Sequence, residues 1–239
     1  MTNPPETLGF DPGPIATVDD LLSVEVKEWG ESLWVISPDV IHTEYRAPLD
    51  ELKALCGNTI CARADVVYRL EQAQRFLELE NPDLQIVVTY GYRPDYLQCK
   101  YFVQRLGMVR EVNPKITLKQ GIDLAHDYAA FPPVAGHPTG GCIDATIRNR
   151  RTGKELDMGA PVYCPSPLCY ARYPYIPPKA RANREFLRWI LECYGFYAFN
   201  GEFWHFSFGD REWAFHNNTS AIYGPLPSEA LSSAQVYIP

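Results

Sequence analysis

Hydrophobic positions recur along the chain with two periods, and their alternation predicts a mixture of helices and strands. Between Cys61 and Glu80, apolar residues return at every third or fourth position, which is typical of an amphipathic helix. Residues 84–90 follow as a run rich in β-branched side chains, which predicts a strand that delivers Arg93 at its end. Similar patterns predict a short strand over 32–36, helices over 96–106, 118–130 and 182–194, and strands over 142–147 and 202–208.

Two connections between these elements carry their own signals. Residues 196–199 and the strand that starts at Glu202 flank Asn200-Gly201, a dipeptide that favours a two-residue turn in a hairpin. Residues 148–155 are polar and predict a second hairpin tip. Residues 160–178 are rich in proline and tyrosine and show no hydrophobic periodicity. We expect a loop, long enough to form a lid or a cleft wall.

The charge balance argues against some classes of partner. A formal net charge of −7 makes a nucleic-acid backbone an unfavourable partner. No stretch approaches the apolar length needed to span a bilayer, so no membrane partner is expected. The first residues, Met1–Thr7, lack the basic and apolar regions of a signal peptide, which predicts a cytoplasmic location.

The candidate chemistry lies in two short stretches, residues 136–144 and residues 202–205. A catalytic zinc takes three protein ligands and leaves a position open for water, and an unligated carboxylate nearby serves as general base. His137, Asp144 and His205 fit the ligand roles, and Glu202 fits the base. A single histidine in a core is most often structural, but the four residues together in this order favour a metal centre.

The spacing of Glu202 and His205 leaves two arrangements open. They are three positions apart, so a regular strand would point them to opposite faces. Either Glu202 lies at the entry of the strand, after Asn200-Gly201, or a bulge re-aims one of the two side chains.

Because the candidate residues lie in the middle and in the C-terminal third of the chain, one folded unit is favoured. With 239 residues, 46% of them hydrophobic, the chain can bury one sizeable core. We predict a single α+β domain over 1–239 with a central, mostly antiparallel sheet flanked by helices and the metal centre at the sheet. Within it we expect a wrapping segment over 1–55, a catalytic core over 56–212 and a loosely packed tail over 213–239.

These motifs resemble those of the VanX-type D-alanyl-D-alanine dipeptidases, zinc enzymes related to D,D-carboxypeptidases and peptidoglycan endopeptidases. The family motif S-x-H-x-x-G-x-A-x-D corresponds to residues 135–144, where Ala135 replaces the serine and Cys142 replaces the alanine. The motif E-x-W-H is intact at residues 202–205, and the family marks G-Y-R-P and D-M-G occur at 91–94 and 157–159. The resemblance extends from about Cys61 to Phe208.

The resemblance implies one Zn²⁺ ion per chain, bound by His137, Asp144 and His205, with Glu202 as general base. It also implies that Arg93 binds the oxyanion that develops during peptide hydrolysis, since a fixed cation stabilises such a charge well. A surface salt bridge is the alternative role for this arginine.

The implied substrate is D-alanyl-D-alanine or a related D-amino-acid dipeptide. Asp157 would pair with the substrate's ammonium group, with turn capping as its alternative role, and Tyr92 and Trp204 are the other candidate substrate-binding residues. Two alternatives remain for the function. One is a D,D-carboxypeptidase or endopeptidase on peptidoglycan peptides, and the other is an inactive, metal-stabilised peptide-binding protein. An unligated Glu202 favours an enzyme, because a binding protein needs no base.

The remaining cysteines and histidines are expected to be structural. Seven is an odd number of cysteines, and we expect most of them to be reduced and buried, with a Cys164–Cys169 bridge as the pairing left open. His126 is expected to be structural or exposed, and His216 to lie at the surface.

Overall fold

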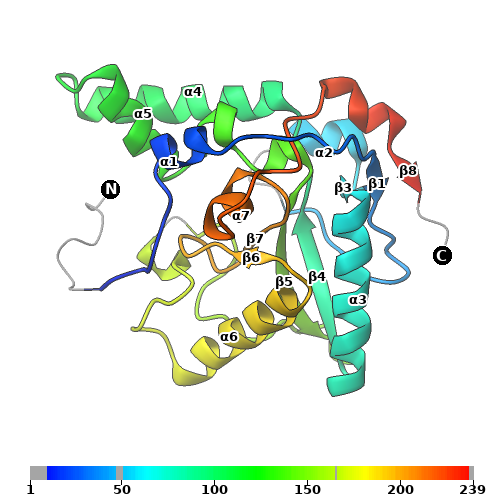
Figure 1. Cartoon of the computed structure of the whole chain (residues 1–239). Helices are drawn as coiled ribbons and strands as arrows, with labels where there is room; N and C mark the ends of the chain where they lie inside the picture. The colour runs from blue at the N-terminus through cyan, green and yellow to red at the C-terminus, as the bar shows by residue number, and fades with distance from the viewer. Residues whose placement is uncertain (1–9, 47–50, 165, 237–239) are drawn as a thin grey trace.

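A five-stranded sheet forms the centre of the computed structural model, which describes residues 10–46, 51–164 and 166–236 (Figure 1). The strand order is β2-β4-β5-β7-β6. The strands are β2 (His42–Thr43), β4 (Leu84–Tyr90), β5 (Cys142–Asn149), β6 (Tyr197–Ala198) and β7 (His205–Ser207). Within this sheet, as far as the described residues go, only the β2–β4 pair is parallel, so the predicted α+β fold with a central, mostly antiparallel sheet flanked by helices is confirmed.

The two faces of β5 differ in chemistry because side chains alternate along a strand. Ile143, Ala145 and Ile147 belong to the large apolar core, together with residues of the helices α3 (Ala64–Glu80) and α6 (Pro178–Cys193). Cys142, Asp144 and Thr146 alternate with them and therefore point to the opposite face. The sheet thus presents one apolar face and one face with polar groups.

The pairing of β4 with β5 is interrupted close to this polar face. Val88 pairs with Ala145 and Tyr90 pairs with Asp144, so Thr89 is an extra residue in β4. Such bulges re-aim side chains and are frequent beside functional sites.

A second, three-stranded sheet of order β3-β1-β8 packs beside the first and corrects one prediction. The predicted strand near residue 33 is present as β1 (Leu33–Val35), and it pairs with β3 (Cys61–Arg63) and β8 (Gln235–Val236). The helix predicted to begin at Cys61 therefore begins three residues later, because residues 61–63 form a strand against β1.

The other helices follow the predicted periods with shifted ends. The helix predicted over 96–106 extends as α4 over Asp95–Val112, and the one predicted over 118–130 is α5, which ends at His126. Figure 1 shows α4 and α5 lying together along one edge of the molecule. The remaining short elements are α1 (Val18–Ser23), α2 (Glu51–Cys56), α7 (Arg211–His216) and the 3₁₀ turns η1 (Pro132–Val134), η2 (His137–Thr139), η3 (Pro167–Cys169) and η4 (Ser228–Ser233).

The predicted two-residue turn at Asn200-Gly201 is wrong. Strands β6 and β7 do pair, but Ala198 pairs with Phe206, so the connection runs over residues 199–204. Asn200 is buried, its amide donates to the Pro14 carbonyl oxygen at 2.8 Å, and its own side-chain oxygen accepts from Arg188. These long-range bonds decide the path of this connection in place of the local turn preference. The other predicted tip is confirmed, since Arg148 and Glu155 pair across it.

The expectation of a loosely packed tail is wrong for the residues up to Tyr223. Ala221 and Tyr223 are completely buried, and the Tyr223 hydroxyl donates to Glu31 at 2.8 Å. His216 does not lie free at the surface either, because its ring stacks on Tyr197 with centroids 4.0 Å apart.

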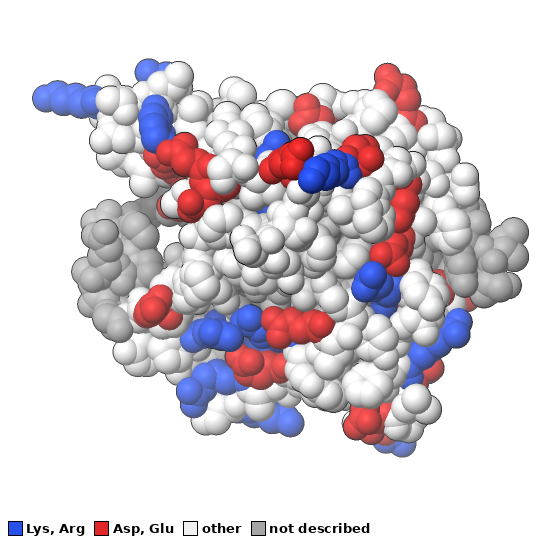
Figure 2. All heavy atoms as spheres, viewed as in Figure 1, with Lys and Arg blue, Asp and Glu red and all other residues white. Residues whose placement is uncertain are grey.

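Charged side chains of both signs lie on the face of the molecule that Figure 2 shows. Acidic and basic side chains are interspersed there. Within the described ranges, no helix has the length and apolar character that would let it cross a membrane. Residues 1–9, on which the expectation about a signal peptide depends, lie outside the described residues.

Candidate metal centre

The register of β5 and β7 brings four polar side chains together on one face of the sheet. Cys142 pairs with Ser207 and Asp144 pairs with His205, so all four side chains point the same way. The Asp144 carboxylate oxygen Oδ1 lies 3.0 Å from His205 Nδ1. The opposite ring nitrogen of His205, Nε2, lies 3.5 Å from the Ser207 hydroxyl.

His137 reaches the same point from the loop that precedes β5. Its Nδ1 lies 2.8 Å from the Gly91 carbonyl oxygen, so Nδ1–H donates and Nε2 is left with its lone pair. Nε2 lies 3.6 Å from Asp144 Oδ2. The loop depends on Gly140, which has φ of 70° and where a Cβ atom would lie 2.8 Å from Leu33.

The separations from Asp144 to the two imidazoles, each to a different carboxylate oxygen, are close to those between ligands of one divalent cation. Two ligands of one tetrahedral zinc lie roughly 3.3 Å apart when each bond is about 2.0 Å long. The Asp144 oxygens lie 3.0 and 3.6 Å from the two imidazole nitrogens. A thiol is close as well, because ligand atoms of His137, Cys142 and His205 lie within 4.8 Å of one another. Two imidazoles in their neutral form and a carboxylate are among the ligands that zinc prefers.

The electrostatics of the centre favour a positive charge between its ligands. Burial lowers the pKa of His137 to about 3, so this ring is neutral and able to bind a cation. Burial raises the pKa of Asp144, but His137, His205 and Arg93 outweigh burial and hold it below its ordinary value. Burial lowers the pKa of His205, yet Cys142 and Asp144 beside it raise this pKa well above its ordinary value.

Glu202 lies beside the centre and outside the strand. It belongs to the irregular connection before β7, where the His205 amide donates to the Glu202 carbonyl at 3.2 Å. Of the two arrangements left open by the sequence, the structure has the strand-entry one. Burial raises the pKa of the Glu202 carboxyl to about 7, and the negative charge of Asp144 adds to this shift, while His205, Arg93 and a hydrogen bond from Trp204 oppose it.

Arg93 points into the protein and not to the surface, so the salt-bridge alternative does not describe it. Its Nε donates to the Tyr90 hydroxyl at 2.8 Å and its Nη1 donates to Gln98 at 2.7 Å. The guanidinium also lies over the rings of Tyr90 and Tyr101, 4.7 and 5.1 Å from their centroids. Its positive charge lowers the pKa values of His137, Asp144 and Glu202, so the guanidinium lies beside the centre.

Of the three candidate substrate-binding residues, only Trp204 lies next to the centre. Trp204 is buried next to the centre and contacts Tyr163 edge-to-face at 5.6 Å. Tyr92 packs into a separate apolar cluster with Leu33, and its hydroxyl donates to the Pro227 carbonyl at 3.2 Å. Asp157 is exposed and accepts from the Gly159 amide at 2.8 Å, which is the turn-capping geometry.

Polar residues of the centre that the sequence analysis missed include Ser207, Tyr163 and Asp210. The Tyr163 hydroxyl lies 3.1 Å from Asp144 Oδ2. Asp210 is buried and caps α7 by accepting from the Trp213 amide at 2.9 Å, and among the described residues its other carboxylate oxygen has no hydrogen-bond partner. Tyr163 lies in the aperiodic loop 160–178, where no pattern indicates which side chain points inward.

The remaining cysteines and histidines fall mostly outside the centre. His126 is structural, as predicted, and accepts from the Phe131 amide at 2.9 Å. All seven cysteines lie within the described ranges and are free thiols. Only Cys61 and Cys142 are buried, and Cys193 is exposed, so burial was overpredicted.

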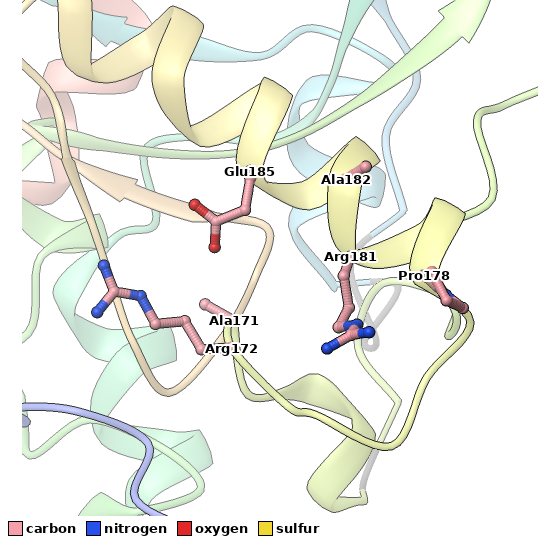
Figure 3. A pocket seen from close by; sticks show the side chains of 6 residues that line it. All are labelled: Ala171, Arg172, Pro178, Arg181, Ala182 and Glu185. Carbon is pink, nitrogen blue, oxygen red and sulfur yellow. The ribbon is translucent and has the colours of Figure 1, made fainter.

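A surface hollow of about 370 Å³ lies at the start of α6 (Figure 3). Its walls include Arg172, Arg181 and Glu185, and none of the candidate site residues lines it. The convergent imidazoles and carboxylates, and not this hollow, therefore define the candidate site.

Comparison with known proteins defines the class of protein first. A family model for peptidase M15, described as D-Ala-D-Ala dipeptidase, matches residues 52–222. This match covers more than half of the chain, so the chain belongs to this peptidase family, and the resemblance read from the motifs is confirmed.

Individual proteins that resemble this chain are a curated relative and two solved structures. A D-alanyl-D-alanine dipeptidase from Synechocystis sp. is 26% identical over 225 residues, which cover 82% of this chain and 90% of the relative. Among solved structures, the LD-carboxypeptidase LdcB matches 88% of this chain and 81% of its own, with 16% identity and a TM-score of 0.43. The vancomycin-resistance D,D-pentapeptidase VanY in complex with Zn(II) matches 69% and 84%, with 13% identity and a TM-score of 0.40.

Proposed function

We propose that this protein is a zinc-dependent dipeptidase that hydrolyses D-alanyl-D-alanine or a related D-amino-acid dipeptide. The observation that supports the proposal is that His205 and His137 lie 3.0 and 3.6 Å from the two carboxylate oxygens of Asp144, beside the partly buried Glu202, whose pKa is raised to about 7. Membership of the peptidase M15 family supports the substrate class.

His137, Asp144 and His205 would hold one Zn²⁺ ion per chain. When bound, the ion would supply a Lewis acid that polarises a peptide carbonyl and lowers the pKa of water toward ~7. Glu202 accepts a proton from the attacking water and then delivers it to the leaving amine. A carboxyl with a pKa near 7 suits both steps, because it takes up and releases protons at neutral pH.

Arg93 stabilises the negative charge that develops on the carbonyl oxygen. Its guanidinium is held in place by hydrogen bonds to Tyr90 and Gln98, so little free energy is needed to reorient it when the charge forms. Trp204 lies between the base and the last imidazole in sequence and, being buried, limits the access of water.

The test uses zinc-loaded protein and four substrates: D-Ala-D-Ala, L-Ala-L-Ala, a pentapeptide that ends in D-Ala-D-Ala, and purified wall fragments. Release of amine from D-Ala-D-Ala alone supports the proposal. Release from the pentapeptide indicates a carboxypeptidase, release from wall fragments alone indicates an endopeptidase, and no release indicates a binding protein. The Glu202→Gln variant, purified in the same way, controls for contaminating peptidases.

A further inference from the structure

Tyr163 has a backbone conformation that aromatic residues rarely adopt. Its φ is 62°, in the left-handed region. Within the described ranges, the other non-glycine residue with positive φ is Asn218, a residue type that tolerates this region. For a tyrosine the conformation costs roughly 1–2 kcal/mol, so contacts of its side chain must hold it there.

The side chain of Tyr163 makes two hydrogen bonds inside the protein. Its hydroxyl lies 3.1 Å from Asp144 Oδ2 and 2.9 Å from Thr89 Oγ1. A tyrosine hydroxyl has one proton, and an ionised carboxylate only accepts, so Tyr163 donates to Asp144 and accepts from Thr89. Thr89 Oγ1 also lies 3.3 Å from the Asp144 carbonyl oxygen, so its one proton is shared between Tyr163 and the backbone of Asp144. Thr89 is completely buried and is the extra residue of the β4 bulge. The bulge therefore directs a donor toward Tyr163.

The ring of Tyr163 is held as well. It packs edge-to-face on Trp204, with centroids 5.6 Å apart, so the ring is fixed against the segment that contains Glu202 and His205. The ring contact and the hydroxyl contacts thus hold this side chain against β4, β5 and the segment before β7.

The bond to Tyr163 engages the oxygen of Asp144 that also faces His137. Oδ2 lies 3.6 Å from His137 Nε2, while Oδ1 lies 3.0 Å from His205 Nδ1. The terminal torsion of an aspartate is broad, so a carboxylate without a fixed partner rotates easily. A hydrogen bond to one oxygen sets this rotation.

We propose that Tyr163 is a positioning residue that fixes the Asp144 carboxylate, through the sequence of bonds Thr89–Tyr163–Asp144, in the orientation required to bind the cation. This inference rests on the proposed function. Tyr163 acts on the carboxylate and takes no part in the reaction itself. Loss of such a partner of a metal ligand typically weakens metal binding 10- to 100-fold.

The experiment compares Tyr163→Phe with Tyr223→Phe. Phenylalanine keeps the ring against Trp204 and removes only the hydroxyl. Tyr223 is the control, because its ring is also packed in the core and its hydroxyl also donates to a carboxylate, Glu31, at 2.8 Å. The zinc dissociation constant is measured by competition with a chelator, and the absorption spectrum of the Co²⁺-loaded protein reports the geometry of the ligands.

Tyr163→Phe is expected to bind zinc 10- to 100-fold more weakly, with an altered Co²⁺ spectrum, while Tyr223→Phe matches the wild type. Thr89→Val, which removes the donor to Tyr163 and keeps the side-chain shape, is expected to show a smaller shift in the same direction. This variant decides the outcome if Tyr163→Phe does not fold.

Three results would overturn the inference. One is a Tyr163→Phe protein with wild-type zinc affinity and spectrum, and another is an equal loss in Tyr223→Phe. The third is a wild-type protein that binds neither Zn²⁺ nor Co²⁺, which would overturn the proposed metal centre together with this inference. The wild-type measurement therefore separates a failure of the proposed function from a failure of the role of Tyr163.

Discussion

Asp144 and Glu202 acquire opposite properties from surroundings that they share. Burial acts to raise the pKa of both carboxyls. At Asp144 the two imidazoles outweigh burial, so the group stays ionised and is suited to hold a cation. At Glu202 the charge of Asp144 adds to burial, so the group is suited to take up a proton near neutral pH. Such a pair of carboxyls with separated pKa values is a common basis for distinct catalytic roles.

Replacing Glu202 tests its role as a base. Glu202→Gln and Glu202→Ala are expected to lower kcat/KM for D-Ala-D-Ala by about 10²–10⁴-fold, because proton transfer loses its acceptor. Zinc content is expected to stay at that of the wild type, since Glu202 is not a ligand. Glu185→Gln, an exposed change on α6, serves as the control. Loss of zinc from the Glu202 variants would contradict the assignment.

The pH dependence of the reaction follows from the same group. Glu202 accepts a proton only when it is ionised, so kcat/KM is expected to fall as the pH drops below its pKa, by tenfold per unit. Burial raises this pKa to about 7, and the positive charge of a bound cation shifts the acid limb to lower pH. The measurement is kcat/KM between pH 5 and 9, with zinc content checked at each pH. An activity that rises toward pH 5 with zinc retained would disprove this role.

The residues that meet at the centre could be predicted from the sequence because their order and spacing are specific. His137, Asp144, His205 and Glu202 do lie together, and what they do there stays a prediction. Tyr163 could not be predicted, since only the folded path of its loop brings it to Asp144.

The elements that were predicted well are those whose local pattern agrees with the tertiary structure. Strand β4 has the predicted ends, because its β-branched run is buried and a proline precedes it. Residues 61–63 satisfy a helical period and nevertheless form β3, because β1 offers them backbone partners. The Asn200-Gly201 turn was overridden in the same way, by bonds to Pro14 and Arg188.

Strand β3 also contains the residue that ties the distant segments together. Arg63 is completely buried, donates to the Thr139 and Gly224 carbonyl oxygens at 2.7 and 3.1 Å, and pairs with Glu28 at 3.0 Å. It thereby joins the N-terminal segment, the loop after His137 and the C-terminal segment.

Replacing Arg63 is expected to destabilise the whole fold. Arg63→Ala leaves several buried carbonyl groups without a donor and is expected to lower the free energy of unfolding by about 3–5 kcal/mol. Urea denaturation measures the loss. Arg151→Ala, in which a surface pair with Asp83 is lost, is the control and is expected to cost less than about 1 kcal/mol. Equal losses in the two variants would contradict a central role for Arg63.

At the scale of the molecule, the metal centre joins parts of the chain that are far apart in sequence. His137 belongs to the loop before β5, Asp144 to β5 and His205 to β7. A cation that binds only when these segments are folded together must stabilise the folded state by mass action. The proposed metal centre would therefore also be a stabilising contact of the fold.

Zinc is accordingly expected to raise the melting temperature of the metal-free protein. At a free zinc concentration 100 times the dissociation constant, the stabilisation is about 2.7 kcal/mol, which corresponds to roughly 5–10 °C for a chain of this size. Differential scanning calorimetry with and without zinc measures the shift. His205→Ala is expected to abolish the shift because a ligand is lost. His126→Ala removes a partly buried imidazole that accepts a hydrogen bond from the Phe131 amide outside the centre, so this variant is expected to melt earlier and to keep the shift. If zinc raised the melting temperature of His205→Ala as much as that of the wild type, the ion would be binding elsewhere.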